Sequence, residues 1–208
     1  MRDSERQMPV QLLALEEVVA ACDRLAGMVR ESGFAPQTVV AIARGGFTPA
    51  RFLYDFLGVS SLAAIRVRHY EAGARCRGTA EVVLPLSADV RGQRVLVVDD
   101  VNDSGDTLAA AFPHLRQFSP AEVRTAVLHE KSSTTCPADF VAERISQWRW
   151  LLYPWAVVED AGGFLRGMPT LPRSREEAAR SLESRYGLRL DAVLLDRVIR
   201  FNDLEVGH

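Results

Sequence analysis

The chain has 208 residues, a hydrophobic fraction of 48% and a formal net charge of −2 at pH 7. This composition is that of a soluble globular protein, and it excludes a strongly basic nucleic-acid-binding surface. The length suffices for one α/β domain with an appendage. Residues 1–10 are polar and no apolar run reaches membrane-spanning length, so we expect neither a secretory signal nor a transmembrane segment. Three widely spaced cysteines suggest neither a zinc site nor a disulfide framework, and we expect a cytoplasmic protein.

The first third of the chain predicts a helix, a strand and a second helix. Apolar residues at helical spacing predict a helix over 12–31. The continuous apolar run Thr38–Ala43 is typical of a strand buried on both faces. Arg44-Gly45-Gly46 follows this strand and precedes a predicted helix at 49–57. A strand, a glycine turn and a helix N-terminus can bind an anion, although the glycines alone can equally mark a simple turn.

Two further strands are predicted at Ser61–Val67 and Glu81–Leu84. The segment between them, residues 69–79, is polar, rich in small residues and without apolar periodicity. Taken by itself, this segment is typical of the solvated tip of a β-hairpin.

The most informative stretch is the strand that begins at Arg94 and ends in Asp99-Asp100. The residues after it, 103–107, combine turn formers with N-cap residues and lead into a helix that begins near Leu108. A loop beyond the carboxyl end of a parallel strand presents free N–H groups and a helix N-terminus to phosphate. The adjacent carboxylates suit sugar hydroxyls, Mg²⁺ or both.

The run from Val97 to Thr107 resembles the phosphoribosyl-pyrophosphate (PRPP) motif of type I phosphoribosyltransferases, in its 6-oxopurine form. The resemblance implies that Asp99 and Asp100 hold Mg²⁺ and the ribose hydroxyls, and that Asp103 acts catalytically near N7 of the base. It also implies a 5′-phosphate site formed by Ser104, Gly105, Asp106 and Thr107. Receiver domains also carry an Asp-Asp strand end, but near their start, whereas 98 residues precede it here.

Asp106 departs from the family pattern, which usually has glycine, lysine or another non-acidic residue at this position. Either its carboxylate faces outward and complements the positive end of the helix, or it weakens the PRPP site.

The same resemblance extends to two earlier segments. It implies that Arg44 and Gly45 belong to a pyrophosphate loop, in which the peptide before the arginine can be cis. It also implies that residues 69–79 close over PRPP and exclude water, with Tyr70 as the loop tyrosine that assists catalysis. Arg68 stands where the family usually has a serine.

A base pocket is predicted from the region after another strand, Glu122–Leu128. Lys131 is the one lysine among 25 basic residues, which agrees with a need for a compact ammonium there, although chance retention of a single lysine explains the count equally well. The resemblance implies that Lys131 donates to the 6-oxo group, that Trp150 stacks on the base and that the backbone at Leu151 reads its 2-position. Ala156 replaces the family's acidic residue, which leaves the 2-position selectivity open.

The resemblance ends near residue 160. Gly162-Gly163 predicts a linker, and capping residues predict a helix from Ser174 to Gly187 and a second one from Asp191 to Phe201. We therefore predict a phosphoribosyltransferase domain at 1–161, with a hood built mainly from 129–158, and a helical extension at 162–208.

Taken together, these patterns predict an α/β protein of the type I phosphoribosyltransferase fold, with a central parallel sheet flanked by helices. The expected reaction joins PRPP and hypoxanthine, guanine or xanthine to give a nucleoside 5′-monophosphate and pyrophosphate, with Mg²⁺ as cofactor. We expect a homodimer or a higher homo-oligomer. Two alternatives stay open: a PRPP-binding regulator without catalysis, which Asp106 keeps possible, and a phosphoribosyltransferase that acts on a different base.

Overall fold

The computed structural model describes residues 8–69 and 80–204. Its contacts divide the chain into two compact units, one formed by Glu16–Gln147 and one by Met1–Leu15 together with Trp148–His208. The two units are described separately. This division by contacts does not coincide with the predicted domains 1–161 and 162–208, because a short N-terminal strand pairs with a strand that follows Gln147. The predicted domain boundary stays a prediction.

The larger unit is built on a six-stranded sheet with the order β4-β3-β2-β5-β6-β7. Every neighbouring pair is parallel except β3 and β4, which are antiparallel. This mostly parallel sheet confirms the predicted fold class. The strands are β2 Thr38–Ala43, β3 Ser61–His69, β4 Ala80–Leu84, β5 Arg94–Asn102, β6 Glu122–Lys131 and β7 Phe140–Ile145.

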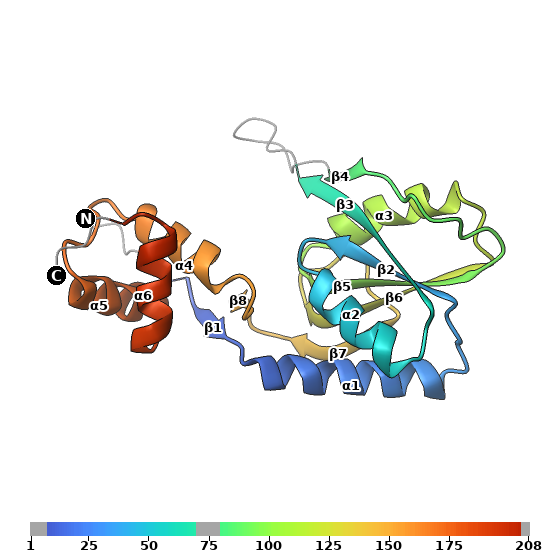
Figure 1. Ribbon diagram of the computed structural model, residues 1–208, viewed down its shortest axis with the longest axis horizontal. Helices are drawn as coiled ribbons and strands as arrows, with labels where there is room; N and C mark the ends of the chain where they lie inside the picture. Colours follow the sequence, from blue (N-terminus) through green and yellow to red (C-terminus); the bar gives the residue numbers. More distant parts are fainter. Residues whose placement is uncertain (1–7, 70–79, 205–208) are drawn as a thin grey trace. The chain divides into compact units, whose positions relative to one another are not determined.

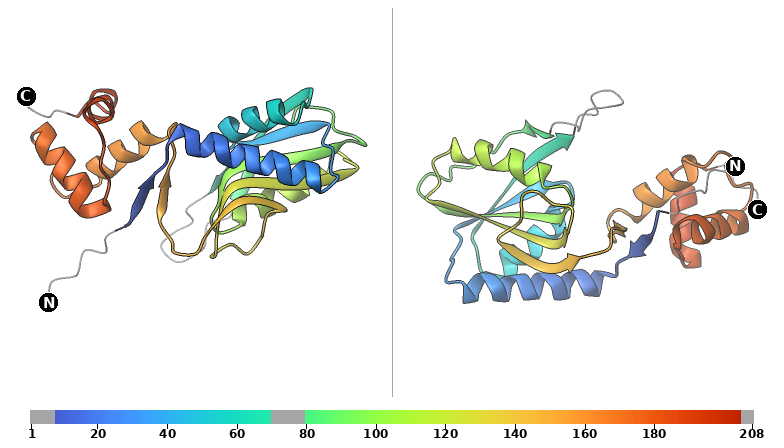
Figure 2. Two further views of the ribbon diagram at one scale, coloured as in Figure 1. Left: turned by 90° about the horizontal axis from the view of Figure 1, so that it is seen from below. Right: turned by 180° about the vertical axis from the view of Figure 1, so that it is seen from behind.

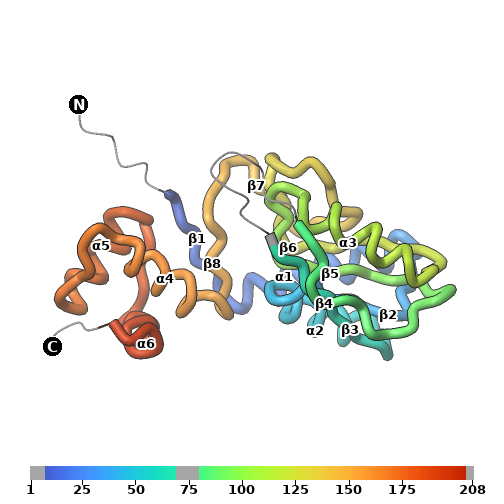
Figure 3. The backbone as a smooth tube through the Cα atoms, turned by 90° about the horizontal axis from the view of Figure 1, so that it is seen from above, coloured from blue at the N-terminus to red at the C-terminus, as the bar shows by residue number. Residues whose placement is uncertain are grey.

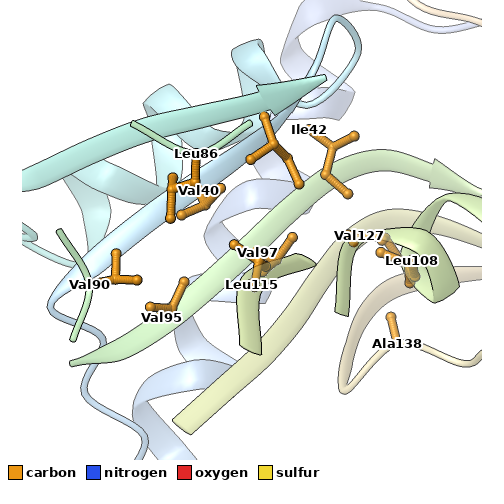
Figure 4. Packing of buried hydrophobic residues seen from close by; sticks show 12 residues of the cluster. Val40, Ile42, Leu86, Val90, Val95, Val97, Leu108, Leu115, Val127 and Ala138 are labelled. Atoms are coloured by element: carbon orange, nitrogen blue, oxygen red, sulfur yellow. The ribbon is translucent and has the colours of Figure 1, made fainter. Parts of the chain in front are cut away.

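Helices cover both faces of this sheet. Helices α1 (Leu15–Glu31) and α2 (Phe47–Phe56) lie on one face, and α3 (Asp106–Arg116) lies on the other (Figures 1 and 2). Side chains of β5, such as Val95 and Val97, pack with residues of α3 in a buried apolar cluster (Figure 4). Because each large apolar side chain contributes roughly 1.5–3 kcal/mol when it is fully buried, this core fixes the strand ends from which the loops described below emerge.

The smaller unit combines two short strands with three helices. Strand β1 (Val10–Leu12) runs parallel to β8 (Trp150–Leu152), so segments about 140 residues apart lie side by side (Figure 3). The helices are α4 (Val157–Arg166), α5 (Arg175–Tyr186) and α6 (Ala192–Phe201). Apolar residues from all three helices and from β8 form one buried core.

The predicted helix ends in this unit are confirmed. The Ser174 hydroxyl accepts a hydrogen bond from the Glu177 N–H at the start of α5, and Gly187 ends that helix with a φ of 65°. Asp191 caps α6 by accepting from the Leu194 N–H.

The predicted linker at Gly162-Gly163 is wrong, because both glycines lie inside α4. A Cβ at Gly162 would lie 2.2 Å from the side chain of Asn202, whose amide donates to the Val158 carbonyl at 2.8 Å. Gly162 therefore serves the close approach of the end of α6 to α4 and does not break the helix. Helix propensity alone could not reveal this tertiary contact.

None of the helices within residues 8–69 and 80–204 combines the length and the apolar character needed to cross a bilayer.

Candidate functional site

Eight of the predicted site residues line one cavity of about 430 Å³ at the carboxyl ends of β2 and β5. Ligand sites of open α/β sheets form at this edge because the loops after adjacent parallel strands meet there. The eight residues are Arg44, Gly45, Asp99, Asp100, Asp103, Ser104, Gly105 and Thr107.

The loop after β2 fits closely against the end of β5. Its Ala43–Arg44 peptide is cis, as the resemblance implied. A Cβ at Gly45 would lie 2.3 Å from a carboxylate oxygen of Asp100, and one at Gly46 would lie 2.3 Å from the Val98 carbonyl oxygen. Only glycine therefore allows Arg44 and the acidic pair to share the cavity.

The acidic pair is partly desolvated and held by backbone donors. Asp99 is 8% exposed, and its Oδ1 accepts from the Asp100 N–H at 3.0 Å. Burial raises the pKa of Asp99, and the neighbouring Asp100 carboxylate raises it further. A bound cation would stabilise two adjacent carboxylates in this setting, which is the donor chemistry that suits Mg²⁺.

The described residues include no group of three or more His, Cys, Asp or Glu side chains that could hold a metal ion. Two carboxylates can nevertheless suffice, because proteins often bind Mg²⁺ through one or two carboxylates together with substrate oxygens and water. Asp99 and Asp100 therefore fit a magnesium ion that arrives with a ligand.

The loop after β5 has the geometry of an anion site. Gly105 adopts a φ of 93° at the N-cap of α3, so the N-terminus of the helix points toward the loop. The Ser104 hydroxyl donates to Asp106 Oδ2 at 2.8 Å. Thr107 lines the cavity, whereas Asp106 is not among the residues that line it. This arrangement favours the first of the two readings of Asp106, in which it complements the helix N-terminus.

We expect Asp106→Asn to lower the free energy of unfolding by roughly 0.3–1 kcal/mol, because the variant loses a negative charge in the first turn of α3. PRPP affinity should change by less than about threefold, which corresponds to a binding free-energy change of less than about 0.7 kcal/mol. Urea unfolding and calorimetry check the two parts. A large gain in PRPP affinity would instead show that Asp106 weakens the phosphate site.

Asp103 and Lys131 form an ion pair beside the cavity. Lys131 Nζ lies 2.5 Å from Asp103 Oδ2, and the Ser133 hydroxyl donates to Asp103 Oδ1 at 3.0 Å. The lysine side chain is 5% exposed and the aspartate side chain 43% exposed. The structure therefore brings together the two residues that the resemblance assigns to N7 and the 6-oxo group of a base.

The remaining predicted residues are not placed in this site. Trp150 and Leu151 belong to the smaller unit, where Trp150 Nε1 donates to Asp160 at 2.8 Å and Leu151 is buried. Whether they share a base pocket with Lys131 stays a prediction. Tyr70 lies outside the described residues.

Sequence reasoning missed two buried polar residues at this edge of the sheet. Asn102 ends β5, and its amide nitrogen lies 3.0 Å from Glu130 Oε2 on β6. Both residues stand a few positions beyond the apolar part of their strands, so polar residues at the ends of two adjacent strands were a signal that could have revealed them.

Comparison with known proteins agrees with this geometry. A profile of the family described as "Phosphoribosyl transferase domain" matches residues 10–158. The chain belongs to this family. As a phosphoribosyltransferase, it is a transferase enzyme, and the match covers both cavity loops and the Asp103–Lys131 pair.

Individual relatives support the family assignment. The phosphoribosyltransferase is 33% identical over 137 residues to the xanthine-guanine phosphoribosyltransferase of Ruegeria sp. (strain TM1040), which covers 64% of this chain and 74% of the relative. The crystal structure of a purine phosphoribosyltransferase from Pyrococcus horikoshii Ot3 is 30% identical, with a TM-score of 0.63 over 71% of this chain and 94% of the other. A Helicobacter pylori xanthine-guanine-hypoxanthine phosphoribosyltransferase, 22% identical over 73% and 96% of the two chains, shares the fold with a TM-score of 0.61.

Proposed function

We propose that this phosphoribosyltransferase transfers the 5-phosphoribosyl group of PRPP to a 6-oxopurine base and so serves purine salvage. The observation that carries the proposal is the single cavity in which the Arg44 loop, the acidic pair and the N-terminus of α3 meet next to the Asp103–Lys131 pair. Relatives named as xanthine-guanine and purine phosphoribosyltransferases support a purine acceptor.

In this proposal the cavity holds PRPP through three groups. The loop from Ser104 to Thr107 and the N-terminus of α3 bind the 5′-phosphate. Asp99 and Asp100 bind the ribose hydroxyls and Mg²⁺, and the guanidinium of Arg44 binds the pyrophosphate. When it is bound, Mg²⁺ neutralises negative charge on the leaving pyrophosphate. These contacts fix C1′ of the ribose at the cavity mouth, in front of the base.

Catalysis then depends on orientation and charge. Departure of pyrophosphate leaves positive oxocarbenium character at C1′, and the base nitrogen must be held against that carbon. Asp103 accepts or shares the proton at N7 of the base, while Lys131 donates to the 6-oxo oxygen. An ammonium group has only donors, so Lys131 favours a carbonyl at this position over the amino group of adenine.

The rest of the base pocket is proposed from Trp150 and Leu151, with Trp150 stacked on the purine. In the smaller unit, the Trp150 ring packs edge-on against Phe164 with its N–H bound to Asp160. These contacts fix the orientation of the ring within its own unit. Tyr70 is proposed to assist from the loop that closes over PRPP. A cytoplasmic location and a homo-oligomeric state remain predictions.

A non-catalytic PRPP-binding regulator is the second candidate. The argument for a regulator is that an acidic Asp106 would weaken phosphate binding. Asp106 accepts a hydrogen bond from Ser104 and does not line the cavity, so this argument is weakened. Transfer to another base is the third candidate, since the placement of Trp150 and Leu151 next to Lys131 is itself a prediction.

Pyrophosphate release tests the proposal. The full chain, Mg²⁺ and PRPP should release pyrophosphate with at least one of hypoxanthine, guanine and xanthine, and far less with adenine. Binding of PRPP without release in the presence of any base would favour the regulator. Release with a base that lacks a 6-oxo group would favour the third candidate.

A further inference from the structure

Glu130 is a buried carboxylate next to Lys131 that the proposed chemistry does not use. Its relative exposure is 1%. The Arg144 guanidinium pairs with Oε1, while the Asn102 amide and the Ala138 N–H donate to Oε2 at 3.0 Å and 2.7 Å. Each of these three partners is a donor, so the site is built for a charged acceptor.

The position of Glu130 in the sheet joins it to the proposed catalytic pair. Asn102 lies opposite Glu130 in the parallel pairing of β5 and β6, and Glu130 lies opposite Arg144 on β7. The next residues along the chain form the ion pair: Asp103 directly follows β5, and Lys131 is the last residue of β6. A row of three bonded side chains therefore lies directly before the catalytic pair.

Asn102 extends this row to the phosphate loop. Its amide also donates to the Cys136 carbonyl at 2.8 Å. The next residues of the same segment touch the loop, since the Thr135 N–H donates to the Ser104 carbonyl at 2.9 Å and a Cβ at Gly105 would lie 2.6 Å from Cys136 N. The contacts of Thr135 and Cys136 with Ser104 and Gly105 do not involve Glu130, so we expect the phosphate loop to keep them when Glu130 is replaced.

We propose that Glu130 is a positioning residue: through Asn102 and Arg144 it fixes the ends of β5 and β6, and so the distance and orientation between Asp103 and Lys131. This role rests on the proposed transfer to a 6-oxopurine. Glu130 itself does not line the cavity assigned to PRPP. Asn102 does line that cavity, but it is not among the residues proposed to bind PRPP, so the loss of Glu130 is expected to change mainly how the base is oriented.

Glu130→Gln is a sharp test because the two side chains have the same shape. The NH2 group of glutamine would face either the Arg144 guanidinium or the Asn102 and Ala138 donors. In both orientations a donor meets a donor, so hydrogen bonds on one side of the network are lost. The matched control is Glu143→Gln, the same change at a half-exposed carboxylate on β7 beside Arg144.

The readout is the ratio of kcat/KM for a 6-oxopurine to kcat/KM for adenine, measured on the full chain. A purely structural defect lowers the active fraction and leaves this ratio unchanged, whereas a displaced Lys131 lowers it. Because small misplacements in an active site cost up to about 100-fold, we expect Glu130→Gln to lower the ratio between about 5- and 50-fold. The KM for PRPP should stay within about twofold of the wild-type value, because the groups proposed to bind PRPP are unchanged. Glu143→Gln should match the wild type in both quantities.

Arg144→Gln provides a second variant, because the Arg144 side chain is largely exposed and its replacement leaves the core packing intact. It should lower the ratio in the same direction, and it decides the question alone if Glu130→Gln does not fold. Wild-type ratios in the folded variants would overturn the positioning role. A wild type that releases no pyrophosphate with any base would instead overturn the proposed function.

Discussion

Replacing both Asp99 and Asp100 with asparagine is expected to weaken PRPP binding by about 100-fold or more. The variant loses the carboxylates that would hold Mg²⁺ and the ribose hydroxyls, and each hydrogen bond to a charged group contributes about 1.5–3 kcal/mol. The fold should survive, because an asparagine oxygen can still accept from the Asp100 N–H, as Asp99 Oδ1 does. Calorimetric titration with PRPP, with and without Mg²⁺, measures the effect.

The double variant should also lose the Mg²⁺ dependence of PRPP binding. Asp55→Asn is the matched control, since Asp55 is an exposed carboxylate in the last turn of α2 and does not line the cavity. Unchanged PRPP affinity in the double variant would refute the assignment of this motif, whatever the reaction.

Lys131→Met should lower kcat/KM for 6-oxopurines roughly 10- to 150-fold. This corresponds to a loss of roughly 1.5–3 kcal/mol of transition-state stabilisation. Methionine keeps much of the apolar stem but leaves the 6-oxo oxygen without its donor. It also removes the cation that lies 2.5 Å from Asp103 Oδ2, so the aspartate loses its ion-pair partner Lys131 while Ser133 still donates to it. PRPP binding should survive, and discrimination against adenine should relax because the donor that disfavours a 6-amino group is gone.

A control separates the loss of the lysine from the loss of a partner for Asp103. Ser133→Ala removes the uncharged hydroxyl that donates to the Asp103 carboxylate and keeps the ammonium group of Lys131. It should leave the preference for 6-oxopurines over adenine unchanged. Steady-state kinetics with hypoxanthine, guanine, xanthine and adenine on each protein make the comparison. Equal kcat/KM values in wild type and Lys131→Met would exclude Lys131 from the base pocket.

Much of the fold could be predicted because its signals are local. The strand Thr38–Ala43 has the predicted bounds, and β5 and its following loop lie where continuous apolar residues, turn residues and N-cap residues indicated. The position of the two cavity loops follows from the same logic, since the loops after adjacent parallel strands meet at one edge. The roles expected of their individual residues came from the resemblance to phosphoribosyltransferases.

Features that depend on distant contacts could not be predicted. Gly162 looked like a helix breaker because its helical role depends on Asn202, 40 residues away. Strand β1 is three residues long and exists through its pairing with β8. The buried Glu130 required knowledge of three donors from three different segments, and no single window of sequence contains them.

The most direct test of the central claim compares the wild type with the Asp99→Asn/Asp100→Asn variant in one reaction. Each protein is incubated with Mg²⁺, PRPP and a 6-oxopurine, and the nucleoside 5′-monophosphate is measured by mass spectrometry. We predict that the wild type forms the nucleotide and pyrophosphate in equal amounts and that the double variant forms at most about 1% as much at limiting PRPP. Equal nucleotide formation by both proteins, or none by the wild type with any 6-oxopurine, would contradict the account.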